Sequence, residues 1–249
     1  IKVFNKIKSV ELKGIYSRTK KKAESLISEY KGLVYYNSIK ELYEKTRADL
    51  VIISVSVENT KKVCLEACKF SWKCLVEKPF GYNFKETQYL AKKLINKKQF
   101  YVALNRNYYS ITQKILEILK NDKTKRVIYI NDQENIKDNY KKYPKKVLNN
   151  FMYANSIHLV DFIRIFARGN LLDVKTIFNL KTKSSHSFAK SLKFSSGDIV
   201  VFTSFWERPA PWSLSISTEN YFFDMKPLES LQVKSKKNKK KIIFIQKLD

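Results

Sequence analysis

Short strand-forming runs alternate with amphipathic helical segments through the first 105 residues. The most informative run is 49–57 (DLVIISVSV), whose apolar and β-branched composition is typical of a strand buried on both faces of a parallel sheet. The alternation predicts an α/β domain with a doubly wound parallel sheet. The predicted strands are 10–16, 34–36, 49–57, 74–77 and 100–104, and the predicted helices are 19–30, 39–45, 59–70 and 84–97.

The second half of the chain has a different pattern. A helix is predicted at 111–120 and a strong helix at 156–167, with a strand at 126–131 and a polar loop at 132–150 between them. Strands then dominate, which predicts an α+β domain with a largely antiparallel open sheet. Its later strands are 174–180, 187–194, 199–206, 214–217, 221–225 and a closing hairpin.

The length and hydrophobic content fit two folded domains. The chain has 249 residues, of which 44% are hydrophobic, so it can bury more than one small core. The change of pattern places the boundary between 1–105 and 106–249. If the first domain binds a ligand, we expect it beyond the carboxyl ends of the strands, where doubly wound sheets bind theirs.

The charge is strongly positive, with 49 Lys and Arg against 23 Asp and Glu, a net charge of +26. Such a charge suggests nucleic acid or an anionic membrane. Only seven of the basic residues are Arg, the better residue for phosphate and base contacts, and the Lys residues are spread over the whole length. We therefore expect solvated lysines and no nucleic-acid partner. The dense run at 234–241 is interpreted as a charged hairpin turn.

No apolar run approaches the ~18 residues of a membrane span, so no membrane partner is expected. The cysteines are Cys64, Cys68 and Cys74, an odd number that makes a poor disulfide framework. Cys64 and Cys68 share a helix face, but no His or Cys follows at metal-ligand spacing, so no metal is expected. Reduced thiols in a cytoplasmic protein are the preferred interpretation.

Polar or unusual residues lie at the ends of four of the predicted strands. Because the carboxyl ends of parallel strands meet at one edge of a sheet, these residues are candidates for a single cofactor site. They are Ser17 and Arg18, Val55 and Ser56, Glu77 and Lys78, and Asn105 and Arg106.

The order of these motifs along the chain resembles that of a known enzyme family. A strand ends in Glu77-Lys78-Pro79, and 80 residues after Lys78 a predicted helix carries His158 and, three residues on, Asp161. This arrangement resembles the glucose–fructose oxidoreductase and inositol dehydrogenase (Gfo/Idh/MocA) family over nearly the whole chain. The resemblance implies a Rossmann-like first domain and an NAD(P)-dependent oxidoreductase. It also implies hydride transfer to or from a sugar or nucleotide-sugar hydroxyl or ketone, and a homo-oligomer formed through the sheet of the second domain.

The chain departs from the family at the phosphate-binding turn. The family has a Gly-rich turn after its first strand, where pyrophosphate meets a helix N-terminus. None of the five glycines of this chain forms a Gly-x-Gly pair. The simplest interpretation is a fragment that lacks the first strand and the Gly-rich turn, and that is also cut at its C-terminal end. The alternative is a natural protein that has lost cofactor binding.

By resemblance, Lys78 and His158 are the catalytic residues. A lysine ammonium can hydrogen-bond the reacting hydroxyl and stabilise the developing alkoxide, and an imidazole can accept the proton. Asn155 and Asp161 are expected near the substrate. Members of the family often carry an Asp four residues before the His, where this chain has Ala154. The alternative interpretations are that Lys78 is an ordinary surface lysine and that His158 is a histidine of the core.

Cofactor choice is argued from the end of the second family strand, where an acid would bind the ribose hydroxyls of NAD. This chain has Ser17 and Arg18 there, and a guanidinium pairs well with a 2′-phosphate, so NADP is preferred over NAD. Val55 and Ser56 are expected against the cofactor, with Glu77 at the nicotinamide ribose. Asn105 and Arg106 are expected near the nicotinamide or the substrate.

The sequence does not assign a single role to several aromatic and histidine side chains. Tyr108 and Tyr140 are substrate-cleft candidates by position only, while the aromatics of 206–212 (WERPAPW) either bind a sugar face or pack in the core. His186 lies in a polar stretch and is expected on the surface. The alternative to an enzyme is a non-catalytic dinucleotide-binding sensor or scaffold, which Ala154 favours and the retained Lys78 and His158 oppose.

Overall fold

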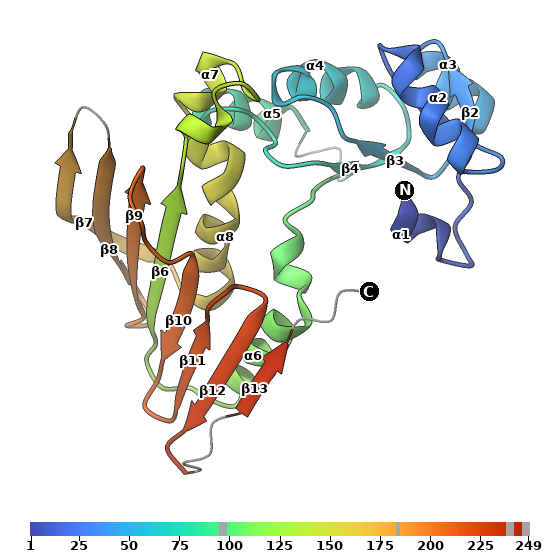
Figure 1. The fold of residues 1–249 in the computed structure, drawn as a ribbon. Helices are drawn as coiled ribbons and strands as arrows, with labels where there is room; N and C mark the ends of the chain where they lie inside the picture. The colour runs from blue at the N-terminus through green and yellow to red at the C-terminus, as the bar shows by residue number, and fades with distance from the viewer. Residues whose placement is uncertain (95–98, 183–184, 238–241, 246–249) are drawn as a thin grey trace. The chain divides into compact units, whose positions relative to one another are not determined.

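The computed structural model describes residues 1–94, 99–182, 185–237 and 242–245. The chain divides into two compact units, Ile1–Ala103 and Leu104–Asp249 (Figure 1). The first unit contains parallel strands with helices between them, and the second is built on one large, mostly antiparallel sheet. The predicted combination of a Rossmann-like domain and an α+β domain is therefore confirmed.

All strand pairs of the first unit are parallel. The strands β1 and β2 pair with each other, and β3, β4 and β5 form a second group. A doubly wound sheet has a further strand between two such groups, and no strand among the described residues joins them. The helices are α1 (Lys2–Asn5), α2 (Lys20–Glu29), α3 (Ile39–Thr46), α4 (Val57–Ala67) and α5 (Phe84–Leu94), and the strands are β1 (Gly14–Tyr16), β2 (Val34–Tyr36), β3 (Leu50–Ile53), β4 (Lys73–Val76) and β5 (Phe100–Val102).

The prediction that the run 49–57 is buried on both faces is wrong. Leu50 is 40% exposed and Ile52 is 41% exposed, whereas Ile53 is buried. The reason is that β3 is the edge strand of its group and that α4 and α5 lie on the same side of that group (Figure 1). The strand also ends earlier than predicted, because Val57 already begins α4.

Local capping explains where α3 begins and ends. The Ser38 hydroxyl accepts a hydrogen bond from the Glu41 N–H at 3.0 Å, and the Glu41 carboxylate reaches back to the Asn37 N–H at 2.8 Å. The first contact satisfies an amide group that the first helical turn leaves without a backbone partner, and the second fixes the residue before the cap. The helix ends at Arg47, whose φ of 46° is left-handed.

The second unit carries an eight-stranded sheet in the order β13-β12-β11-β10-β6-β9-β8-β7. Only β6 and β9 pair in parallel, and every other pair is antiparallel. The strands are β6 (Val127–Glu134), β7 (Leu171–Lys181), β8 (His186–Phe194), β9 (Ile199–Trp206), β10 (Ser213–Ser217), β11 (Tyr221–Met225), β12 (Ser230–Ser235) and β13 (Ile242–Ile245).

Helices and short helical turns accompany this sheet. The helices α6 and α8 share one core with it, in which Ile115, Leu159 and Phe162 pack against Ile130 and Val200. The helices are α6 (Ser110–Lys120), α7 (Lys145–Leu148) and α8 (Ile157–Phe166), with 3₁₀ turns η2 (Asn105–Tyr108) and η3 (Lys137–Asn139) and a π-helical turn η4 (Met152–Ser156) directly before α8.

The stretch 132–150 is not a loop throughout, and that prediction is corrected. The strand β6 continues to Glu134 because each of its residues pairs with β9, as far as Glu134 opposite Trp206. Asp132 and Glu134 occupy inward-facing positions and are buried. The period-2 pattern of the strand was not recognised because its last inward-facing residues are carboxylates rather than apolar side chains. Residues 145–148 form α7.

The closing hairpin is confirmed by the antiparallel pairing of β12 with β13, although residues 238–241 of its basic turn lie outside the described residues. No helix among the described residues has the length and hydropathy needed to cross a membrane.

Candidate active site

The carboxyl ends of three strands of the first unit lie side by side. In the register of the sheet, Ile53 of β3 is opposite Val76 of β4, and Val76 is opposite Val102 of β5. The residues that follow these strands therefore leave the sheet at one edge. Val55 with Ser56 and Glu77 with Lys78 are brought together there.

Lys78 is held at this edge through its backbone. Its N–H donates to the Glu77 carboxylate at 2.7 Å, and the Glu77 N–H donates to the Ile53 carbonyl at 2.9 Å, which extends the β3–β4 pairing by one bond. The Lys78–Pro79 peptide bond is cis, and Pro79 is buried while Lys78 is half-buried. Glu77 therefore fixes the loop that presents the lysine.

Ser56 stands at the start of α4, where its hydroxyl accepts a hydrogen bond from the Asn59 side-chain amide at 2.6 Å. Val55 before it is 40% exposed. An exposed apolar side chain beside a helix N-terminus offers a surface for a flat ring next to the positive end of a helix dipole, which favours an anion.

Ser17 and Arg18 follow the other parallel pair, whose register ends with Tyr16 opposite Tyr36. The Ser17 carbonyl accepts a hydrogen bond from the Tyr35 hydroxyl at 3.1 Å, while the Arg18 side chain is exposed. The turn is thus fixed by its backbone, and the guanidinium is available to a ligand.

Asn105 and Arg106 belong to the second unit, in the turn η2. The Arg106 guanidinium lies 4.3 Å from the ring centroid of Trp212 and 3.8 Å from the Glu229 carboxylate, and its side chain is 12% exposed. Burial lowers the pKa of Arg106, which the charges of Tyr109 and Glu229 partly oppose. These contacts within the second unit occupy much of the side chain that was expected to contact a cofactor or substrate.

His158 lies in the first turn of α8 and is 8% exposed. Asp161, one turn further on, has both carboxylate oxygens engaged: one accepts from Arg164 at 3.0 Å and the other from Asn107 at 3.3 Å. Asp161 therefore joins α8 to η2.

A buried carboxylate cluster that the sequence did not reveal lies beside the start of α8. Asp132 is fully buried and accepts hydrogen bonds from the hydroxyls of Ser156 at 2.9 Å and Ser204 at 2.7 Å, and from the Trp206 indole at 3.2 Å. Glu134 accepts from the Asn155 side-chain amide at 2.7 Å. The alternation of Asp132, Gln133 and Glu134 was the available signal.

The cluster lies next to Ala154, the position at which this chain differs from the family pattern. Ala154 is buried in the π-helical turn and has no group that titrates. Asn155, the next residue, connects that turn to the Glu134 carboxylate. A π-helical turn inserted before an α-helix is frequently found at functional sites.

The family described as "Oxidoreductase family, NAD-binding Rossmann fold" matches residues 1–104, which include the whole of the first unit. No curated protein sequence matches the chain.

Solved structures resemble the whole chain in fold. A dehydrogenase from Chromobacterium violaceum has a TM-score of 0.81 at 12% identity, covering 98% of this chain and 75% of that protein. A UDP-N-acetylglucosamine 3-dehydrogenase from Acidithiobacillus ferrooxidans has a TM-score of 0.75 at 14% identity, with 97% and 77% coverage. A Gfo/Idh/MocA family oxidoreductase from Vibrio cholerae has a TM-score of 0.75 at 12% identity, with 99% and 76% coverage. Residues 1–104 therefore match the NAD-binding Rossmann domain of the Gfo/Idh/MocA oxidoreductases, the family that the sequence motifs resemble.

Proposed function

We propose that the protein transfers a hydride between a nicotinamide cofactor and a hydroxyl or ketone carbon of a sugar or nucleotide sugar. The observation that carries this proposal is the position of Lys78, at the carboxyl end of β4 in a family-matched Rossmann domain. The relative from Acidithiobacillus, whose name gives a nucleotide sugar as its substrate, supports the choice of substrate class.

The residues at the strand ends fit a dinucleotide. Val55 presents exposed apolar surface to a flat ring, and Ser56 stands at a helix N-terminus that favours an anion. Glu77 lies on the same edge, where a ribose hydroxyl can donate to its carboxylate. The cofactor, when bound, supplies or accepts the hydride.

We assign the proton chemistry to Lys78 and His158. The Lys78 ammonium donates a hydrogen bond to the reacting oxygen of the substrate and so stabilises negative charge that develops there. The His158 imidazole accepts the hydroxyl proton in oxidation and returns it in reduction. The proposal requires Lys78 of the first unit and His158 of the second unit to reach the same substrate.

Glu134 is proposed to position the start of α8, the helix that carries His158. It would take over this role from the Asp that family members often have where this chain has Ala154. Its carboxylate holds Asn155, which precedes His158 by three residues and so lies on roughly the same helix face. Asn155 and Asp161 are proposed to lie at the border of the substrate site.

NADP is the proposed cofactor. Arg18 is exposed directly after β1, and its guanidinium can bind a 2′-phosphate through two parallel hydrogen bonds. Binding of NADPH and NADH measured by nucleotide fluorescence tests this choice. We expect tighter binding of NADPH and loss of that preference in Arg18→Ala. A tenfold preference for NADH would overturn the assignment.

Turnover over a panel of keto sugars and nucleotide sugars tests the reaction. We expect Lys78→Ala and His158→Ala each to lower kcat by about 10²-fold or more, the range of general acid–base catalysis. Lys73→Ala is the matched control, because Lys73 is an exposed lysine at the opposite end of the same strand. Turnover that Lys78→Ala leaves unchanged would refute the mechanism.

The second candidate function is a non-catalytic dinucleotide-binding sensor or scaffold. Ala154 favours it, because the position has no group that can take up a proton. This function predicts that NADPH binds with no turnover of any compound in the panel. Failure of both nucleotides to bind would exclude it together with the enzyme.

A further inference from the structure

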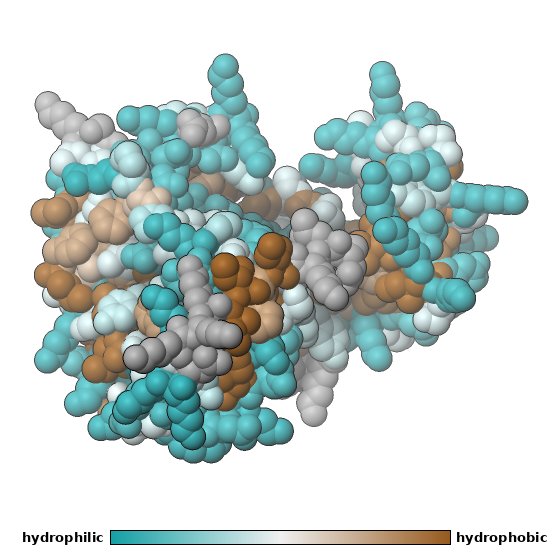
Figure 2. Space-filling view, turned by 60° about the horizontal axis from the view of Figure 1, so that its bottom comes forward, coloured by the Kyte–Doolittle hydropathy of each residue, from teal (hydrophilic) through white to brown (hydrophobic). Residues whose placement is uncertain are grey.

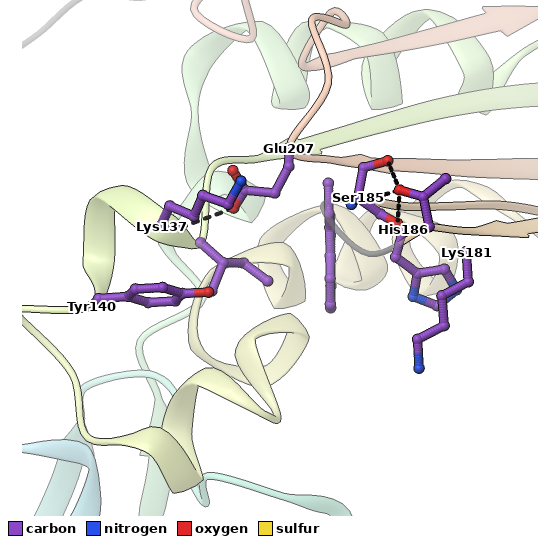
Figure 3. Close-up of a pocket in the computed structure, with 9 residues that line it drawn as sticks. Lys137, Tyr140, Lys181, Ser185, His186 and Glu207 are labelled. Carbon is purple, nitrogen blue, oxygen red and sulfur yellow. Dashed lines mark hydrogen bonds between the residues drawn. The ribbon is translucent and has the colours of Figure 1, made fainter.

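An open pocket of about 200 Å³ lies in the second unit, at the ends of β6 and β9 and beside the β7–β8 hairpin. Figure 3 shows Lys137 and Tyr140 on one side of it and Lys181, Ser185 and His186 on the other. Neither the family match nor the strand-end motifs account for this pocket. The lining residues that bear on binding are Lys137, Lys181, Ser185, His186, Trp206 and Glu207.

An aromatic side chain held in one orientation lines the pocket. The Trp206 indole N–H donates to buried Asp132 at 3.2 Å, so the ring is tied to the interior by one edge. The His186 ring meets it edge-on at a centroid distance of 6.2 Å. His186 is in turn fixed by the Asn179 side chain at 2.8 Å. An indole held in this way offers a preorganised face to a flat ring.

Positive charge exceeds negative charge around the pocket. Lys137 and Lys181 line it, and both side chains are exposed. The Arg208 guanidinium donates to the hydroxyl of the lining residue Ser185 at 3.1 Å. Glu207 is the acid among the lining residues, and its carboxylate already accepts a hydrogen bond from the Lys137 N–H at 2.8 Å. Ammonium and guanidinium groups around an aromatic ring suit a ring compound that carries phosphate.

The backbone at the pocket rim is held in an unfavourable conformation. Glu207 has a φ of 60°, in the left-handed region that is unfavourable for a residue with a side chain. Its N–H donates to the Glu134 carbonyl at 2.8 Å. Such strain is typical of sites that must present a side chain in one position.

We propose that this pocket binds a phosphate-bearing ring, the part of the substrate that does not react. The proposal rests on the proposed oxidoreductase function and specifies its substrate as a phosphorylated compound. The ring lies against Trp206, and Lys137 and Lys181 bind the phosphate. Nucleotide sugars and sugar phosphates share this chemistry.

Hydrogen bonds connect the pocket to the helix that carries His158. Asp132 accepts from the Trp206 indole and from the Ser156 hydroxyl with the same oxygen. Ser156 is two residues before His158, at the end of the π-helical turn. Trp206 is therefore a positioning residue as well as a binding residue, since its indole and the start of α8 share one carboxylate.

Isothermal titration of the chain with UDP, glucose 1-phosphate, uridine, glucose and inorganic phosphate tests the pocket without any turnover. We expect UDP, glucose 1-phosphate or both to bind at least tenfold more tightly than the other three. The double variant Lys137→Ala/Lys181→Ala should weaken that binding at least tenfold. Lys175→Ala, an exposed lysine on β7 paired with Asp173, should leave it unchanged.

Trp206→Phe tests the aromatic ring separately, since it keeps a ring but removes the N–H that Asp132 accepts. We expect this variant to bind phosphorylated ligands more weakly than the wild-type protein does. If the variant fails to fold, the exposed lysine variants still test the pocket. Binding of UDP alone identifies a nucleotide substrate, and binding of glucose 1-phosphate alone identifies a sugar phosphate.

Three results would overturn the proposal: no binding of either phosphorylated ring, binding that the double lysine variant does not weaken, or inorganic phosphate binding as tightly as the ring compounds. The outcome is separate from that of the turnover tests. Turnover that depends on Lys78 without this binding refutes the pocket alone, and this binding without such turnover refutes the oxidoreductase function.

Discussion

Cys64 and Cys74 lie in the core of the first unit, and burial raises the pKa of both thiols to about 12, with a smaller contribution from neighbouring thiols. Because the thiolate is the nucleophile, neither should react at neutral pH in the folded protein. Cys68 is half-buried. A thiol reagent should therefore modify at most Cys68 rapidly, and all three after denaturation. Rapid modification of two or more thiols in the native protein would contradict this prediction.

Asp198 is the centre of a buried ion-pair network at residue scale. It accepts hydrogen bonds from the Arg168 side chain at 2.7 and 2.9 Å and from the Arg126 N–H at 3.0 Å. Removing one partner of a buried pair leaves the other uncompensated and costs about 3–5 kcal/mol. We expect Asp198→Asn to lower the free energy of unfolding by an amount in this range. Urea unfolding followed by circular dichroism measures it, with Asp173→Asn on the exposed surface of β7 as the control.

The same aspartate sets a pH dependence. Burial opposes ionisation of Asp198, but hydrogen bonds from Arg168 and Arg126 outweigh it and lower the pKa. A carboxylate whose folded-state pKa is lowered stabilises the protein above the unfolded value of about 3.9 and loses this contribution as the pH falls through the folded-state pKa. The urea concentration at the midpoint of unfolding should therefore decrease when the pH is lowered below about 4. If the urea midpoint of Asp198→Asn depended on pH in the same way as that of the wild-type protein, another group would be responsible for the acid sensitivity.

Single residues also show the limits of the sequence. Lys78 is predicted as a site residue because a strand, a Pro and a distant His-x-x-Asp helix form a pattern along the chain. Asp132 was missed because its partners Ser204 and Trp206 lie 72 and 74 residues away and only strand pairing brings them together. A polar residue at an inward-facing strand position carries no apolar periodicity to indicate burial.

At the scale of elements, the turn between α8 and β7 depends on a glycine. Gly169 has a φ of 77°, and a Cβ added there would overlap the Ser195 hydroxyl. Gly169→Ala should therefore lower the melting temperature of the protein. Gly32→Ala is a matched control, because Gly32 has a φ of 88° but open space around the added Cβ. The conformational cost is similar at the two sites, so an equal loss of stability would show that the overlap relaxes without cost.

Element types were predicted better than element contexts. The helices predicted at 39–45 and 156–167 are confirmed as α3 and α8. The burial of 49–57 was misjudged, because periodicity within one strand does not say how many neighbours the strand has. The loop assigned to 132–150 failed for a related reason, since β6 is extended by pairing with β9 rather than by its own composition.

At the scale of the whole molecule, the second unit exposes much apolar sheet surface. The edge strand β7 is exposed along nearly its whole length, and Leu172 and Ile177 are among its exposed residues. Figure 2 shows brown hydrophobic surface at the left edge, where β7 lies in Figure 1, and near the centre beside β13. Uncovered apolar surface of this kind marks interaction sites, and we propose that a second copy of the chain covers it.

Sedimentation velocity tests this proposal of a homo-oligomer. The wild-type protein should sediment as a dimer or larger species, and Leu172→Lys/Ile177→Lys should shift it toward the monomer. The variant Lys175→Ala on the same strand should sediment like wild type, because it removes no apolar area. A monomeric wild-type protein at micromolar concentration would refute the proposal.

The parallel pairing of β6 with β9 has a consequence for folding. Strand contacts between residues more than 70 positions apart close a long loop of chain, and the entropy cost of that closure makes them slow to form. Both α8 and the β7–β8 hairpin belong to that intervening chain. A newly synthesised chain can therefore form the helix with His158 before Trp206 reaches Asp132. The pocket at the strand ends is complete only in molecules whose large sheet has closed.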